Sequence, residues 1–208
     1  MTDELTPRRT ILDRRQIERT VRRMAGEIVE RNRGVERLLL VGIRTRGVPL
    51  AEKLRAEIQR MEGDEVPLGV LDITLYRDDL STIAPQPVVK GTSFPVGIDG
   101  WTIVLCDDVL YTGRTVRAAL DHLVDWGRPR SVQLAVLVDR GHRELPIQAD
   151  VVGETVPTRA DEVVEVRFES TDGEELVKIM ERPAARRGVA GDDASGGRAA
   201  GGGEGGPA

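Results

Sequence analysis

The sequence contains one cysteine, two histidines and few aromatic residues, and these scarcities exclude several classes of protein. The lone Cys106 cannot form a disulfide within the chain, nor can it supply a zinc site that needs several thiolates. Its place inside an apolar run fits a small core residue better than a nucleophile. Aromatic residues make up only 3% of the sequence and hydrophobic residues 39%, so the core must be mainly aliphatic.

Long hydrophobic segments are also missing. No apolar run approaches the roughly 20 residues that cross a membrane, and residues 1–9 are polar, unlike a signal peptide. We therefore expect a cytoplasmic protein.

The net charge of -5 gives no global argument for binding nucleic acid. The length of 208 residues fits one α/β domain, placed at residues 1–182, followed by a Gly- and Ala-rich tail at residues 183–208 that we expect to be disordered.

Hydrophobic periodicity predicts alternating helices and strands. The expected helices are residues 12–32, with Ile17, Val21, Met24 and Ile28 buried, residues 49–61, with the apolar stripe Leu50, Leu54, Ile58 and Met61, and residues 116–126 and 172–180. The expected strands are residues 38–43, 66–76, 103–106, 132–138, 151–154 and 163–168. This alternation predicts an α/β fold, with a mainly parallel central sheet flanked by helices on both faces.

Residues 103–115 are the most informative segment. An apolar strand runs into Asp107 and Asp108, and a turn containing Thr112, Gly113 and Thr115 then opens a helix. A helix N-terminus offers unpaired N–H groups and partial positive charge, which bind phosphate. The two carboxylates would repel that phosphate, so they suit sugar hydroxyls or a metal. The combination indicates a sugar-phosphate site at the carboxyl end of a strand.

This segment resembles the signature of the type I phosphoribosyltransferases, which bind phosphoribosyl pyrophosphate. Two other interpretations stay open at this point: a chance strand-turn-helix, and a phosphoribosyl-binding fold that has lost catalysis. Transfer from phosphoribosyl pyrophosphate breaks the bond from ribose C1 to pyrophosphate, through a transition state that should resemble an oxocarbenium ion. Such an enzyme must hold the 5′-phosphate, stabilise the departing pyrophosphate and exclude water.

Other polar segments are candidates for the rest of this site. The residues Thr45 and Arg46 follow a strand and precede a helix, where they could contact pyrophosphate, although a solvated surface loop would look the same. Arg77, Asp78 and Asp79 begin a long loop at residues 80–95, which is either a lid or an ordinary charged connection. His142 lies in a loop after another strand, so a role in the site is open to it.

Four segments together resemble the PyrR family, whose members regulate pyrimidine operons and also act as uracil phosphoribosyltransferases. They are residues 40–47, 72–81, 107–118 and 134–146, and the resemblance covers residues 11–180. It implies a type I phosphoribosyltransferase fold with a small hood and a long flexible loop. It implies conversion of uracil and phosphoribosyl pyrophosphate (PRPP) to UMP and pyrophosphate, and binding to the leader of pyr mRNA promoted by UMP or UTP. Family members form dimers that can pair into tetramers.

The resemblance also implies site residues and a metal. The catalytic candidates are Asp107, Asp108 and Arg77. The substrate-binding candidates are Thr45, Arg46, Asp78, Asp79, Val109, Leu110, Tyr111, Thr112, Gly113, Arg114, Thr115, Arg140 and His142. Mg²⁺ is expected to arrive with PRPP and to neutralise leaving-group charge, since no side-chain cluster dedicated to a metal is evident.

The first expected helix carries Arg15, Arg19, Arg22 and Arg23 opposite its apolar face. The family's RNA surface includes this helix, and phosphate contacts there would give salt-dependent affinity. A solvated face with Glu–Arg pairs four residues apart is the alternative, and it would leave a salvage enzyme without RNA regulation. Gly26 stands where related proteins often carry His, which weakens the case for detailed RNA recognition. The sequence leaves open whether control acts on transcription termination or on translation.

Overall fold

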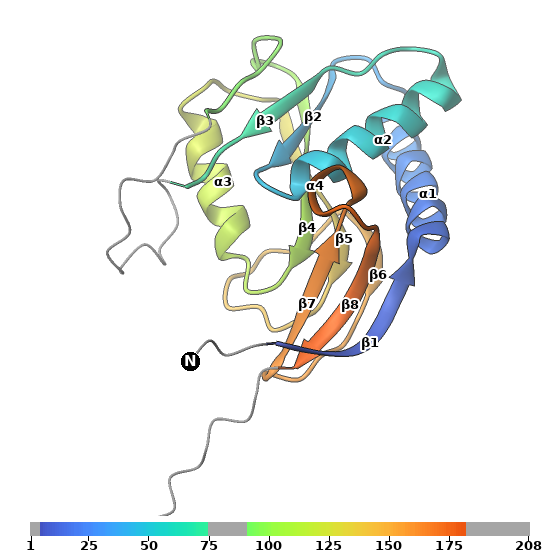
Figure 1. Ribbon diagram of the computed structural model, residues 1–208. Coiled ribbons are helices and arrows are strands. Elements are labelled where there is room, and N and C mark those ends of the chain that lie inside the picture. The colour runs from blue at the N-terminus through green and yellow to red at the C-terminus, as the bar shows by residue number, and fades with distance from the viewer. Residues whose placement is uncertain (1–4, 75–90, 182–208) are drawn as a thin grey trace, which may run out of the picture.

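The computed structural model of the chain describes residues 5–74 and 91–181. In chain order the elements are β1 (Thr6–Asp13), α1 (Arg14–Asn32), β2 (Leu38–Ile43), α2 (Gly47–Glu62), β3 (Leu68–Leu71), β4 (Thr102–Leu110), α3 (Arg114–Val124), β5 (Ser131–Asp139), β6 (Val151–Thr155), β7 (Glu162–Arg167), α4 (Glu169–Asp172) and β8 (Leu176–Glu181). A parallel sheet has the order β3-β2-β4-β5-β6, and a smaller antiparallel sheet has the order β1-β8-β7 (Figure 1). The predicted α/β fold is confirmed.

The local sequence explains where α1 begins and ends. The Asp13 carboxylate accepts the N–H of Gln16 at 2.8 Å, and the Gln16 side chain accepts the N–H of Asp13 at 2.8 Å. This reciprocal capping box satisfies two backbone donors at the start of the helix. The helix ends at Arg33, which adopts a left-handed conformation, and the buried face contains the four apolar residues that the periodicity predicts.

Helices cover both faces of the parallel sheet. The helices α1 and α2 lie on one face and α3 on the other (Figure 1), and an aliphatic cluster fills each interface. All six residues of β2 are buried, as expected for a strand covered on both sides. A Cβ atom at Gly42 would lie 2.5 Å from the Cα of Val48, so glycine is required where α2 starts directly above β2.

The strand order places the candidate site. From β2 the chain crosses over α2 to β3 on one side, whereas from β4 it crosses over α3 to β5 on the other side. The two connections leave β2 and β4 in opposite directions, so their carboxyl ends enclose a crevice. Open α/β sheets bind ligands at such a switch point.

Some expectations drawn from the sequence are wrong, on secondary structure and on burial. Residues 172–180 were predicted to form a helix, but they end the short α4 and then form β8. Val177 and Ile179 are buried at strand spacing, and β8 pairs with β1 and β7 on its two sides. These long-range pairings override local helix propensity. Met61 is 38% exposed rather than part of the core stripe. The first helix begins at Arg14 rather than at residue 12, because Thr6–Asp13 form β1.

Several expectations fall outside the described residues. They are the tail at residues 183–208, the end of the expected strand at residues 75–76, the part of the long loop at residues 80–90, and Arg77, Asp78 and Asp79. Within residues 5–74 and 91–181, no helix has the length and apolar character needed to span a membrane.

Phe168 provides a test of the core. Its side chain is fully buried, in the cluster shared by α1, α2 and the small sheet. We expect Phe168→Ala to lower the free energy of unfolding by about 3–5 kcal/mol, because it leaves a large cavity. Urea denaturation measures this change. The control Val124→Ala removes a side chain that is 73% exposed and should change stability by less than about 0.5 kcal/mol. Equal effects of the two substitutions would contradict the assigned core.

Candidate functional site

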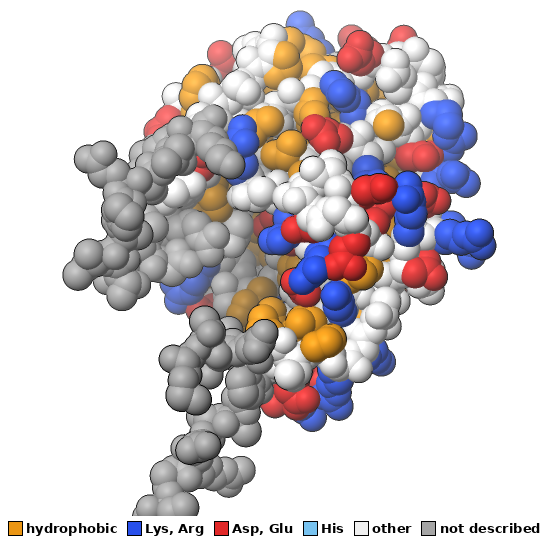
Figure 2. All heavy atoms as spheres, viewed as in Figure 1, with side chains coloured by type: hydrophobic (Ala, Val, Ile, Leu, Met, Phe, Trp, Pro, Cys, Tyr) orange, Lys and Arg blue, Asp and Glu red, His pale blue; other side chains and the backbone are white. Residues whose placement is uncertain are grey.

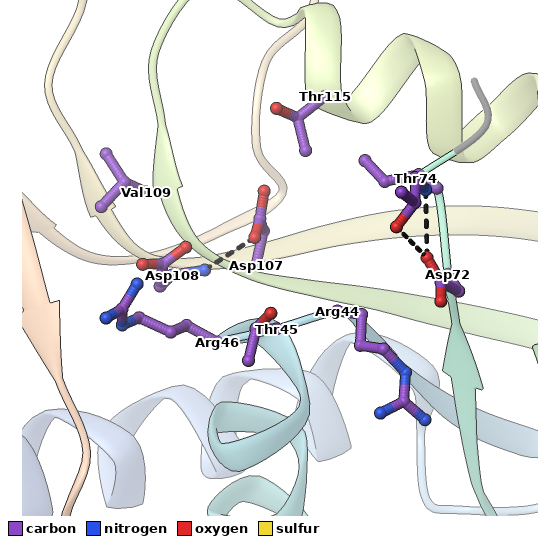
Figure 3. A pocket seen from close by; sticks show the side chains of 10 residues that line it. Arg44, Thr45, Arg46, Asp72, Thr74, Asp107, Asp108, Val109 and Thr115 are labelled. Atoms are coloured by element: carbon purple, nitrogen blue, oxygen red, sulfur yellow. Dashed lines mark hydrogen bonds between the residues drawn. The ribbon is translucent and has the colours of Figure 1, made fainter. Parts of the chain in front are cut away.

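A cavity of about 380 Å³ lies at the switch point of the parallel sheet. Its walls come from the carboxyl ends of β2, β3 and β4 and from the start of α3 (Figure 3). The lining residues are Arg44, Thr45, Arg46, Asp72, Ile73, Thr74, Asp107, Asp108, Val109 and Thr115. The cavity therefore joins three polar segments that are far apart in the sequence.

Two carboxylates form the floor of the cavity at the end of β4. Asp107 is 7% exposed, and its carboxylate accepts the N–H of Asp108 at 3.1 Å. Figure 3 shows the Asp107 carboxylate directed towards Thr115, whereas that of Asp108 is directed towards Arg46. The pair consequently places hydrogen-bond acceptors between the start of α3 and the loop after β2.

The Asp108 carboxyl group is harder to ionise than an ordinary aspartate. Burial raises its pKa above the usual value of 3.8, and the hydrogen bond with Asp107 and the charge of Arg46 offset this only in part. A charged group in a low-dielectric site loses hydration, which favours its protonated form. A ligand that donates hydroxyl hydrogen bonds to the pair would favour the ionised form again.

The loop between β2 and α2 is held close to β4. A Cβ atom at Gly47 would lie 2.2 Å from the carbonyl oxygen of Cys106, so only glycine allows this approach. The loop brings Thr45 and Arg46 to the cavity, as the sequence predicts.

Arg46 is already engaged by Asp172 of α4, the short helix between β7 and β8. Its Nη2 donates to Asp172 at 2.9 Å and its Nε at 3.4 Å. This hydrogen bond raises the pKa of Arg46 above its ordinary value. Burial opposes ionisation of Asp172, but the hydrogen bonds from Arg46 and from the Phe168 N–H hold its pKa below 3.8. A pyrophosphate group that binds Arg46 must therefore compete with Asp172.

The turn before α3 has the features of a phosphate-binding loop. Gly113 precedes the helix with φ of 91°, a left-handed conformation that favours glycine. The Thr112 hydroxyl accepts the N–H of Arg114 at 3.3 Å. The N–H groups of the first helical turn carry the positive end of the helix dipole, and Thr115 from this turn lines the cavity.

Three of the predicted residues form a separate group beside the turn. The Arg140 guanidinium lies 4.1 Å from the centre of the Tyr111 ring and donates to the Thr158 hydroxyl at 3.1 Å. The rings of Tyr111 and His142 meet edge to face, with centres 5.8 Å apart. The imidazole Nε2 of His142 is 2.7 Å from the carbonyl oxygen of Thr158. Tyr111 is 39% exposed, so this group presents an aromatic edge to solvent.

The residues that line the cavity differ in part from those predicted. Leu110 is 1% exposed and packs in the cluster beneath α3, so its side chain does not face the cavity. Arg44, from the loop in which Thr45 and Arg46 were predicted, also lines the cavity, whereas the sequence did not identify Asp72 and Thr74 as lining residues. Asp72 is 6% exposed, and its carboxylate accepts hydrogen bonds from the N–H and hydroxyl of Thr74 at 3.0 and 2.5 Å. Their position directly after β3, a neighbour of β2, is the signal that identifies them.

Comparison with known proteins points to one family. A phosphoribosyl transferase domain model matches residues 8–170. The chain is 61% identical over 171 residues to the bifunctional protein PyrR of Pelotomaculum thermopropionicum, an alignment that covers 82% of this chain and 94% of the relative. It is 55% identical over 175 residues to the bifunctional protein PyrR of Deinococcus radiodurans, and this alignment covers 84% of this chain and 96% of the relative.

Solved structures match the fold at low sequence identity. The hypoxanthine phosphoribosyltransferase of Trypanosoma cruzi aligns with a TM-score of 0.65 and 16% identity, covering 85% of this chain and 98% of that chain. A hypoxanthine-guanine phosphoribosyltransferase of Bacillus anthracis aligns with a TM-score of 0.60 and 16% identity, covering 84% and 98%. These likenesses support the fold of the parallel sheet and its helices.

The raised pKa of Asp108 gives a pH prediction. Above pH 3.8 and below the raised pKa, the folded protein holds a proton that the unfolded chain has released. The free energy of unfolding contributed by this group therefore falls as pH rises through that window. Asp108→Asn cannot ionise, so its stability relative to the natural protein should increase from acid to neutral pH. Urea denaturation across this range measures the difference, and a difference independent of pH would contradict the assignment.

Proposed function

The chain belongs to the PyrR family of phosphoribosyltransferases, and from this membership we propose that it converts uracil and PRPP to UMP and pyrophosphate. It also binds the leader of pyr mRNA under the control of uridine nucleotides, and so regulates pyrimidine biosynthetic genes. The observation that carries the proposal is the Asp107–Asp108 pair beside the N-terminus of α3, in a chain that is 61% identical to a bifunctional PyrR protein.

The proposed chemistry assigns the ribose 5-phosphate to the end of β4. Asp107 and Asp108 accept hydrogen bonds from the ribose hydroxyls, and the turn at residues 109–115 donates N–H and hydroxyl groups to the 5′-phosphate. As the bond to pyrophosphate breaks, positive charge develops at the ribose ring. The nearby carboxylates stabilise this charge electrostatically.

The leaving pyrophosphate is assigned to the loop after β2, where Thr45 and Arg46 line the cavity. Phosphoribosyltransferases in general use PRPP together with Mg²⁺. Among the described residues no group of three or more His, Cys, Asp or Glu side chains is placed to hold a metal ion by itself. The substrate phosphates would therefore supply most of the oxygen ligands of Mg²⁺, and Asp107 or Asp108 of the cavity would add a carboxylate oxygen. Bound magnesium would neutralise charge on the leaving group.

The uracil is assigned to the side of the cavity near Tyr111, Arg140 and His142. The edge-to-face contact of Tyr111 with His142 and the Arg140 contact fix the orientation of the aromatic ring. Arg77, Asp78 and Asp79 lie outside the described residues, and we retain them as proposed site residues on the family resemblance.

The exposed face of α1 is the proposed RNA-binding surface. Figure 2 shows basic and acidic side chains interspersed over the side of the molecule where α1 lies. Arg22 lies 3.5 Å from the Glu57 carboxylate, and Arg23 donates to the Val152 carbonyl at 2.9 Å. Arg15 and Arg19 are exposed and enter no ion pair with another described residue.

The four arginines of α1 fall into two pairs according to their contacts with neighbouring elements. Arg22 and Arg23 are held by neighbouring elements, whereas Arg15 and Arg19 remain available for phosphate groups. The contacts of the first pair hold α1 against α2 and β6, which presents the second pair on a fixed surface. We therefore assign most of the RNA phosphate contacts to Arg15 and Arg19.

Two further expectations stay predictions. The homodimer, with pairing into a tetramer, is tested by sedimentation of the purified chain with and without UMP. A cytoplasmic location follows from the proposed access to newly made pyr mRNA.

The catalytic assignment predicts the behaviour of Asp107→Asn. An amide is a weaker acceptor than a carboxylate, and loss of a charge-assisted hydrogen bond costs roughly 1.5–3 kcal/mol. We expect the KM for PRPP to rise about 10- to 100-fold, as measured by UMP formation from uracil. The KM for uracil should change much less. Kinetics equal to those of the natural protein for both substrates would contradict the assignment of Asp107 to the ribose site.

The RNA assignment predicts the behaviour of Arg19→Glu. Reversal of this charge should weaken binding of the pyr leader RNA by at least about tenfold in the presence of UMP. The RNA affinity of the variant should also depend less steeply on salt concentration. UMP formation should be unchanged. The control Arg128→Glu makes the same charge change at an exposed position in the loop between α3 and β5. Loss of UMP formation with intact RNA binding in Arg19→Glu would contradict the assignment. Weak binding of RNA by the natural protein that does not respond to UMP would favour a salvage enzyme without RNA regulation.

A further inference from the structure

Arg143 lies in the loop between β5 and β6, and its guanidinium group donates to four oxygen acceptors. Its Nε donates to the Ile147 carbonyl at 3.0 Å, and its Nη1 donates to the Gly141 carbonyl at 3.1 Å. Its Nη2 donates to the Asp139 carboxylate. The fourth acceptor is the Tyr111 carbonyl in the turn before α3, which Nη1 contacts at 2.8 Å. One side chain thus ties together two loops about 30 residues apart in the sequence.

The two loops are also joined through their backbones. The Thr112 carbonyl accepts the N–H of Glu144 at 3.0 Å and the N–H of Leu145 at 3.1 Å. A Cβ atom at Gly113 would lie 3.3 Å from the Cβ of Ile147, so the turn packs closely against this second loop. The loop after β5 therefore supports the outer side of the proposed phosphate-binding turn.

These contacts determine where the N–H groups of the turn point. In a trans peptide unit the carbonyl and the following N–H point in opposite directions. Because the Tyr111 carbonyl is directed to Arg143, the N–H of Thr112 is directed away from the supporting loop. Because the Thr112 carbonyl is directed to Glu144 and Leu145, the N–H of Gly113 is directed away from it as well. Both donors are thereby oriented before any ligand arrives.

We infer that Arg143 is a positioning residue for the 5′-phosphate, which acts by fixing the backbone of the turn before α3. This inference rests on the proposed function and adds a residue to the site. Arg143 is not itself a phosphate ligand, because four of the five N–H donors of its guanidinium are engaged within the protein. Its side chain is 23% exposed, so these hydrogen bonds are partly shielded from water.

The inference separates phosphate recognition from the other parts of the ligand. If Arg143 only stabilised the fold, its loss would weaken the binding of every ligand together with thermal stability. If it orients the turn, its loss should weaken ligands that carry a 5′-phosphate and spare those that lack one. UMP and uridine form a suitable pair of probes, because they differ only in that phosphate.

The experiment measures UMP and uridine affinities of the full-length chain by calorimetry, together with its melting temperature. For Arg143→Gln we expect the Kd for UMP to rise at least about tenfold, since small displacements of a positioned group have large effects. The Kd for uridine should change less than about twofold. Asp139→Asn, which loosens the Arg143 guanidinium without removing it, should give a smaller change in the same direction. Arg143→Lys should give an intermediate change, because lysine keeps the charge without the planar fork.

Arg159→Gln is the matched control. The Arg159 side chain is half exposed, and its guanidinium donates to Asp161 and Glu181 rather than to the turn before α3. This variant should bind UMP as the natural protein does. Unchanged UMP affinity in both Arg143→Gln and Asp139→Asn would overturn the inference. Equal weakening of UMP and uridine would overturn it too. A natural protein that binds neither UMP nor PRPP would instead refute the proposed function.

Discussion

The parallel pairing of β2 with β4 is the contact on which the candidate site depends. It aligns Gly42 with Cys106, so the two strands end side by side and their following loops diverge. Because the sheet is covered by helices on both faces, these loops cannot shift independently without exposing buried aliphatic side chains. The close approach of Gly47 to the Cys106 carbonyl then fixes the distance between the loops. The cavity is consequently a property of the sheet rather than of any single loop.

Electrostatic contacts join the small antiparallel sheet to this framework. The Glu175 side chain is 2% exposed and lies 2.6 Å from the Lys53 ammonium of α2 and 3.8 Å from Arg14 of α1. Asp172, three residues earlier, holds Arg46 of the loop after β2. A buried carboxylate requires such partners, since an unpaired charge in the interior is strongly destabilising. The segment around α4 is therefore anchored to both helices of one face and to the edge of the cavity.

The sequence allowed the parallel sheet and much of the cavity to be predicted, because those features follow from local patterns. The apolar run before Asp107 predicts the buried strand, and Gly113 predicts the turn that opens the helix after it. Other features depend on partners distant in the sequence. Residues 176–181 are a strand because β1 and β7 lie on either side, and Asp72 enters the cavity because β3 pairs with β2. The contact of Arg143 with the Tyr111 carbonyl, 32 positions away, is of the same kind, and no local pattern indicates it.

The ion pair between Arg46 and Asp172 makes the end of the cavity that we propose for pyrophosphate similar to an ion-exchange site. An incoming anion replaces a resident carboxylate, so binding exchanges one partner of the arginine for another instead of removing the arginine from water. The same carboxylate is available when the anion departs, because it lies in α4, in a segment that Glu175 anchors to α1 and α2. The free energies of the anion-bound and anion-free states would therefore differ less than if Arg46 had no partner in the free state. In the proposed transferase, such a balance would favour release of the product over its tight retention.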